Sequence, residues 1–204
     1  MIKTFWGSLA LVISISAASC APALVPMAEQ SGDIDLQNRI VTKKVGGALV
    51  SIQTQEWQFI PTDLEQYFTA FFFLIRNESD KSVELSLKNI AMVDGRGNQW
   101  MPVVPREIEK EYYGRGIGPA GSGYFSFGSG GRSSMLGLGV QVPLGSPPPP
   151  LDISLRSLHE GNIVPGAQVR GFVYFRKVLL EDEPFLLHLE FNQSGEDFHF
   201  IRKR

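Results

Sequence analysis

The chain has 204 residues, of which 43% are apolar and 20% are charged, and its formal net charge is -2. This apolar content excludes a wholly disordered chain, because it is enough to build a core, and the length suits one sizeable domain or two very small ones. The near balance of 19 basic and 21 acidic residues excludes a general nucleic-acid binder, which needs clustered cations.

The N-terminal segment has the layout of a secretory signal. Lys3 precedes a mostly apolar run from Phe5 to Ile15, and small residues follow at positions 17–19. A transmembrane anchor is one alternative, but residues 5–18 number 14, and a helix needs about 20 to cross the hydrocarbon core. An ordinary cleaved signal that leaves Cys20 as an incidental thiol is the other alternative. No second stretch is continuously apolar, which excludes a protein with several membrane spans.

The end of this segment, Ala17-Ala18-Ser19-Cys20, resembles the lipobox of bacterial lipoproteins, and Cys20 is the only cysteine in the chain. The resemblance implies cleavage between Ser19 and Cys20, a diacylglycerol on the Cys20 sulfur and an acylated amine, and several acyl chains make anchoring effectively permanent. The next residue is Ala21 rather than aspartate, which by resemblance favours the outer membrane of a diderm bacterium.

Three regions follow from this reading. Residues 1–19 are expected to be the lipoprotein signal peptide. Residues 20–45 are expected to be a lipidated N-terminus and tether, since they contain two prolines and a polar run from Gln30 to Lys44. The alternative for part of this segment is a short docked element that uses the apolar residues Ile34, Leu36 and Ile40. Residues 46–204 are expected to form one domain.

Most of this domain reads as short strands separated by turn residues. The first half of the domain predicts four strands, at residues 48–52, 67–75, 82–93 and 100–104. The strand at 67–75 is apolar on both faces and is therefore expected to be buried on both sides. Clusters at 77–80 and 94–98 predict turns. Residues 105–113 suit either a two-turn helix with Ile108 and Tyr112 on one face or a strand.

Residues 114–150 differ in kind, with 11 Gly, 6 Pro and 6 Ser. Glycine at this density loses too much entropy on ordering to form a core by itself, so the segment is interpreted as a long insertion. Its aromatic residues suit an adaptable contact surface; they are Tyr124, Phe125 and Phe127. A loop that packs loosely on its own domain is the alternative.

The second half predicts further strands, at 151–155 and 169–178, and a C-terminal hairpin. On 169–178, Val173 and Phe175 share one face, and Phe172 and Tyr174 share the other. For the hairpin, a turn at 193–196 would place Phe191 opposite Phe198 and Glu190 opposite His199. Four large apolar residues would then share one face; they are Leu189, Phe191, Phe198 and Phe200.

Seven or more short strands with little helix predict an all-β fold, an antiparallel β-sandwich with a long Gly/Pro-rich insertion. The Asn-x-Ser turn in 77–98 and the Pro-Gly turn before Gly-Phe-Val-Tyr-Phe in 165–175 resemble the immunoglobulin-like domains of bacterial envelope lipoproteins. The resemblance spans about residues 48–104 and 151–201. It implies a fold and a location, not a reaction.

Candidate chemistry is sparse. Gly116, Gly118 and Gly121 match the spacing of a dinucleotide fingerprint, but Pro119 interrupts the motif and no βαβ unit surrounds it, so composition explains the match. One predicted outer face carries His188, Glu190 and His199. These side chains suit either a metal site or, more simply, a solvated His–Glu pair. No G-x-S-x-G elbow exists, and no cofactor is expected.

The sequence therefore favours a lipid-anchored, non-enzymatic envelope lipoprotein. It would act as a binding or structural module, with the membrane as one partner and another envelope protein or peptidoglycan as a second. The alternatives are a metal-binding or enzymatic envelope protein that uses His188, Glu190 and His199, and a purely structural role without a dedicated ligand.

Overall fold

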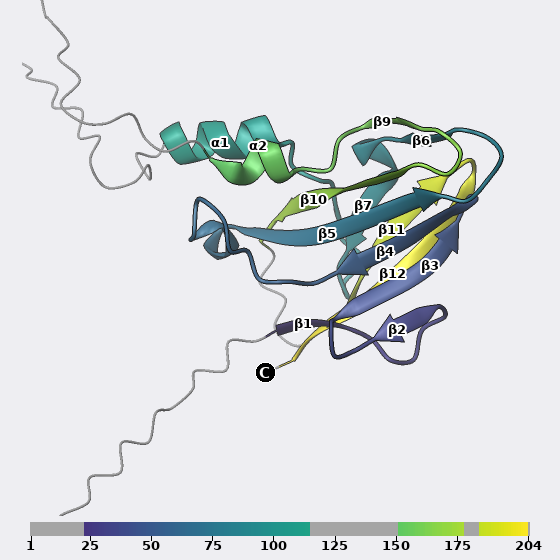
Figure 1. Cartoon of the computed structure of the whole chain (residues 1–204). Helices are drawn as coiled ribbons and strands as arrows, with labels where there is room; N and C mark the ends of the chain where they lie inside the picture. The colour runs from purple at the N-terminus through teal and green to yellow at the C-terminus, as the bar shows by residue number, and fades with distance from the viewer. Residues whose placement is uncertain (1–22, 115–150, 178–183, 204) are drawn as a thin grey trace, which may run out of the picture.

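The computed structural model describes residues 23–114, 151–177 and 184–203, which form two packed five-stranded sheets (Figure 1). The first sheet has the order β1 (Ala23–Pro26), β12 (Ser194–Lys203), β11 (Phe185–Phe191), β7 (Ile90–Val93) and β8 (Gln99–Trp100). The second has the order β10 (Gln168–Arg176), β5 (Phe68–Asn77), β4 (Ala48–Gln53), β3 (Ile40–Val45) and β2 (Asp33–Asp35). A separate ribbon pairs β6 (Val83–Leu85) with β9 (Gly161–Ile163). The strand pairs are antiparallel, which confirms the predicted β-rich antiparallel architecture.

The main core lies between the two sheets and is rich in phenylalanine. Phe71 and Phe73 on β5 are fully buried against residues of the first sheet. The ring of Phe71 lies 5.9 Å from that of Phe175, 6.0 Å from that of Phe185 and 5.5 Å from that of Phe200, measured between centroids. Since successive side chains of a strand point to opposite faces, the neighbours of these residues must be covered elsewhere.

A second core covers the outer face of the β10–β5 part of the second sheet. Here Phe172 and Tyr174 of β10 meet Trp57, Ile108 and other buried residues. Three segments form this cover: α1 (Pro105–Gly114), α2 (Asp152–Arg156) and residues 54–67, which include the 3-10 turn η1 (Leu64–Gln66). The two helices lie side by side (Figure 1). The predicted division into two faces is therefore confirmed for residues 169–176, whereas the predicted strand 169–178 is too long, since β10 ends at Arg176 and residue 178 lies outside the described residues.

The predicted tether over 20–45 is wrong for its described part, because residues 23–45 hold three strands of the sandwich. Val41 and Val45 are fully buried, and Leu24 and Ile34 pack against the same core. Alternation in β3 supplies this buried face, so the described part of the predicted tether belongs to the sandwich.

Residues 82–93 do not form the single strand that alternation suggested. Ser86 accepts a hydrogen bond from the Lys88 amide and begins the 3-10 turn η2 (Leu87–Asn89), which separates β6 from β7. The two strands consequently join different sheets. The predicted strand at 100–104 is also shorter, because β8 ends at Trp100 and the Val103 amide then donates to Tyr174.

The two ambiguous or strand-like segments around the insertion are both helical. Residues 105–114 form α1, with Ile108 and Tyr112 buried as the helical alternative predicted. The predicted strand at 151–155 is wrong, because residues 152–156 form α2. On a strand Ile153 and Leu155 would share a face, whereas the structure buries Ile153 completely and leaves Leu155 74% exposed, as helical geometry requires.

The C-terminal hairpin forms, but with a register different from the predicted one. Phe198 lies opposite Leu187 rather than Phe191, a shift of four positions along β11 (191 to 187). The turn is Asn192-Gln193, with φ of 51° and 65°, instead of residues 193–196. Because the shift is even, the apolar face is preserved as predicted, while the expected pairing of Glu190 with His199 is wrong.

This turn gives a stability prediction. Both of its residues have the left-handed backbone that two-residue hairpin turns require, and glycine tolerates it best at the second position. We expect Gln193→Gly to raise the free energy of unfolding by about 0.5–1 kcal/mol, and Gln193→Val to lower it. Urea unfolding followed by circular dichroism measures both. Equal midpoints for the two variants would contradict the assigned turn.

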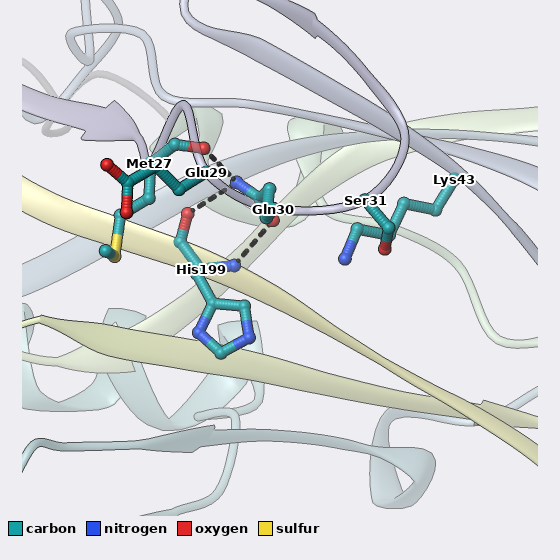
Figure 2. A pocket seen from close by; sticks show the side chains of 6 residues that line it. All are labelled: Met27, Glu29, Gln30, Ser31, Lys43 and His199. Carbon is teal, nitrogen blue, oxygen red and sulfur yellow. Dashed lines mark hydrogen bonds between the residues drawn. The ribbon is translucent and has the colours of Figure 1, made fainter.

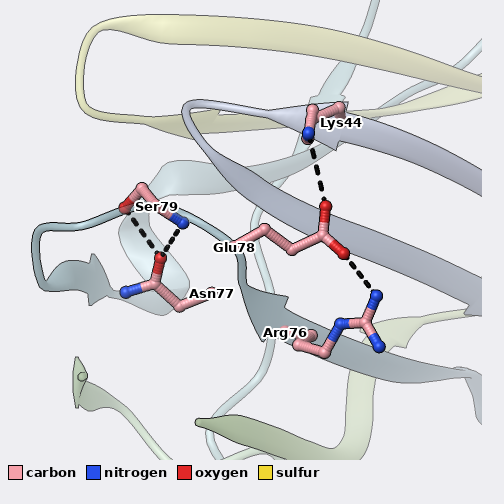
Figure 3. Close-up of polar contacts among 5 residues, drawn as sticks. All are labelled: Lys44, Arg76, Asn77, Glu78 and Ser79. Atoms are coloured by element: carbon pink, nitrogen blue, oxygen red, sulfur yellow. Dashed lines mark hydrogen bonds and ion pairs between the residues drawn. The ribbon is translucent and has the colours of Figure 1, made fainter. Parts of the chain in front are cut away.

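A buried asparagine organises the turn that follows β5. The Asn77 amide nitrogen donates to the carbonyls of Lys81 (2.7 Å) and Ile163 (2.8 Å), and its oxygen accepts from the backbone and hydroxyl of Ser79 (Figure 3). The neighbouring Glu78 pairs with Lys44 at 3.3 Å and with Arg76, and these contacts lower the pKa of Glu78, the Arg76 hydrogen bond most strongly. The predicted turn at 77–80 thus fastens the β6–β9 ribbon to the main sheet.

Candidate functional site

The candidate site is a pocket at the outer edge of β12. After β1 the chain leaves this edge and crosses to β2, and the crossing segment, β3 and β12 line an open pocket of about 410 Å³ (Figure 2). The lining residues come from three parts of the chain; they are Met27, Glu29, Gln30, Ser31, Lys43 and His199. The volume falls in the range of small-ligand pockets, and five of the six lining residues have polar side chains.

Gln30 completes the hydrogen bonding of the β12 backbone where β1 ends. Its side-chain nitrogen donates to the carbonyl of His199 at 2.8 Å, and its oxygen accepts from the amide of His199 at 2.9 Å. The same nitrogen donates to the Met27 carbonyl, and the Met27 amide donates to His199. A side-chain amide thereby takes the place that a backbone amide of the next strand residue would occupy (Figure 2).

Lys43 reaches the same edge from the core-facing side of β3. The residue is only 7% exposed, its ammonium donates to the carbonyl of Asp197, and its Nζ lies 5.2 Å from the centroid of the Phe198 ring. Burial lowers the pKa of Lys43 because the ammonium loses hydration, while Glu196 and Asp197 act in the opposite direction. The pocket therefore contains a buried ammonium group beside the edge of β12, where it can donate hydrogen bonds to backbone carbonyls.

The structure does not assemble the set of residues that the metal-binding alternative required, namely His188, Glu190 and His199. His188 binds Asp197, with 2.6 Å between Nδ1 and Oδ1, and Glu190 lies opposite Gly195. His199 instead borders the pocket. Within the described ranges no three His, Cys, Asp or Glu side chains converge to hold a metal ion. The register difference explains the separation, since the predicted pairing had put Glu190 beside His199.

Several predicted residues lie outside the described part of the chain. These are Ser19 and Cys20, the glycine motif at 116–121 and the contact residues Tyr124, Phe125 and Phe127. The two ends of the insertion are nevertheless placed, because α1 and α2 pack together, and Glu109 accepts a hydrogen bond from the Ser154 amide at 3.2 Å. An ion pair of 3.1 Å joins Glu111 to Arg176 and holds α1 over β10.

Sequence reasoning missed the two polar residues that define the pocket. Lys43 had a signal, since it falls between Val41 and Val45 on the buried face of an alternating strand. Gln30 had none, because its partner His199 lies 169 positions away in the chain.

Comparison with protein-family models, curated proteins and solved structures finds no match for this chain. Among the residues that the structure describes, helices are too short or too polar to cross a membrane.

Proposed function

We propose that this protein is a lipid-anchored envelope lipoprotein, held at the outer membrane of a diderm bacterium through Cys20. It acts without catalysis, as a binding or structural module for another envelope component. The observation that carries the proposal is the position of the only cysteine, directly after a signal-like segment and three residues before the first strand residue, Ala23. Three residues span at most about 10 Å, so the anchor would hold the β1 end of the sandwich close to the lipid surface.

The immunoglobulin-like identity of the sandwich belongs to the same proposal. It is supported by the two turn motifs that resemble such domains. The backbone N–H of Asn77 donates to the backbone carbonyl of Ala167, and the backbone N–H of Gly166 donates to the backbone carbonyl of Asn77, both at 2.9 Å. The Asn-x-Ser turn and the Pro-Gly turn are therefore one hydrogen-bonded unit at one end of the sandwich, as expected for residues that specify a fold.

The anchor is tested by mass spectrometry of the mature protein from native membranes. We expect the chain to begin at Cys20 and to carry a diacylglycerol and an acyl group, and Cys20→Ser to abolish both the modification and membrane retention. Ser19→Ala keeps a small residue before the cysteine and serves as the matched control that is still processed. An unmodified thiol at Cys20, or retention of residues 1–19, would refute the proposal.

The contact role is tested by cross-linking in intact envelopes. The substitution of Tyr124, Phe125 and Phe127 by serine is expected to abolish cross-links to a second envelope component that the unchanged protein forms. Leu155→Ala, an exposed apolar change on α2, is the control that keeps them. Cross-links that survive the triple substitution would rule out a contact through the insertion.

A further inference from the structure

The edge of β12 that faces away from β11 is covered over only part of its length. β1 pairs with residues 200–203, and Met27 and Gln30 satisfy His199. Within the described residues, no strand pairs on this side with the remaining segment, Ser194–Phe198. Since His199 directs both backbone groups to this side, the alternate residues Gly195 and Asp197 direct theirs the same way.

An uncovered edge of this kind is a template for another strand. Its unpaired N–H and C=O groups can continue the sheet into a second molecule, and proteins commonly block such edges with lysines or with charged side chains that point inward. Two copies of β12 are self-complementary here, because antiparallel pairing about a two-fold axis would join the same segment of each copy.

Two side chains occupy positions on this edge that a further strand would use. Lys43 donates to the carbonyl of Asp197, and Gln30 holds both backbone groups of His199. Figure 2 shows them reaching β12 from separate segments of the chain. Burial is unfavourable for the charge of Lys43 and lowers its pKa. An ammonium group at this core-facing position therefore costs stability that an apolar side chain would not cost.

We propose that Lys43 and Gln30 form an edge guard that prevents β12 from pairing with β12 of a second copy of this chain. The guard acts together with Glu196 and Asp197, whose like charges would be brought together in a pairing centred on Asp197. This inference is independent of the lipid anchor, because it rests only on contacts within the sandwich.

The test compares the full chain in mild detergent with the double variant Lys43→Met, Gln30→Leu, using chemical cross-linking in 0.1 M and in about 1 M salt, where charge repulsion is screened beyond about 3 Å. We expect the unchanged chain to remain monomeric and the double variant to give a product of twice the monomer mass, most abundantly at high salt. Lys44→Met is the matched control, since it removes an exposed lysine of the same strand and leaves both guard residues in place, and it is expected to stay monomeric.

Amide hydrogen exchange locates the contact. In the double variant the amides of Gly195 and Asp197 should exchange at least tenfold more slowly than in the unchanged chain, whereas those of β8 should be unaffected. Circular dichroism verifies that the variant is folded. A folded variant that stays monomeric at both salt concentrations, or that associates without protection of β12, would overturn the proposal. If the double variant does not fold, Lys43→Met alone is tested by the same criteria.

Discussion

Replacing Phe71 by alanine is expected to lower the free energy of unfolding by about 3–5 kcal/mol. The side chain is fully buried at the centre of the sandwich, and its ring contacts aromatic rings on β10, β11 and β12. Its removal leaves a cavity between the sheets that close packing on both sides prevents from collapsing. The measurement is urea unfolding at pH 7, monitored by circular dichroism.

The control for this prediction is Leu155→Ala on α2. Leu155 is 74% exposed, so the same kind of truncation should change stability by no more than about 0.5 kcal/mol. Similar losses for the two variants would mean that the sheets do not pack through Phe71.

Asn77→Asp is expected to destabilise the fold by about 2–4 kcal/mol at pH 7, with almost no change in side-chain volume. The substitution replaces the donor that serves the carbonyls of Lys81 and Ile163 with a carboxylate oxygen, which repels both. Burial and these carbonyls should raise the pKa of the new carboxyl in the folded state. The protonated form is therefore favoured by folding, so the loss should be smaller at pH 4 and grow as the pH rises towards 7.

Ser79→Ala is the matched control for this variant. It removes the hydroxyl whose oxygen lies 2.8 Å from both the Asn77 side-chain oxygen and the Lys81 carbonyl, and whose one proton can serve either of them. Both Asn77 donors stay in place, so a smaller loss of about 1 kcal/mol is expected, without the pH dependence. If Asn77→Asp has the same stability at pH 4 and pH 7 relative to the unchanged chain, the buried hydrogen-bond arrangement around Asn77 is incorrect.

The faces of the long strands could be predicted from the sequence, whereas their partners could not. The alternation of Phe172 and Tyr174 with Val173 and Phe175 is a local property, and both faces are buried as it predicts. The hairpin register depends on where the chain reverses, and an even shift leaves the pattern unchanged. Only Asn192 indicates that the chain reverses at Asn192-Gln193, whereas Gly195 favours a turn at 193–196, which is wrong.

The N-terminal strands and α2 show a second limit of local patterns. The strands in residues 23–35 have only four and three residues, too few for an alternating pattern to be recognised, and they form because neighbouring strands supply the pairing. In α2 only five residues are helical, too few for helix periodicity to differ from alternation. The pocket is harder still, because Gln30 and Lys43 both act on residues more than 150 positions away, at His199 and Asp197.

The pairing of Ala23 with Lys203 places the beginning and the end of the folded body on neighbouring strands. A reporter fused after Arg204 would therefore emerge at the same end as the proposed acyl chains, crowded against the bilayer. Fusions intended to probe the far side of the molecule are better inserted at the opposite end of β12, where the Asn192-Gln193 turn joins it to β11.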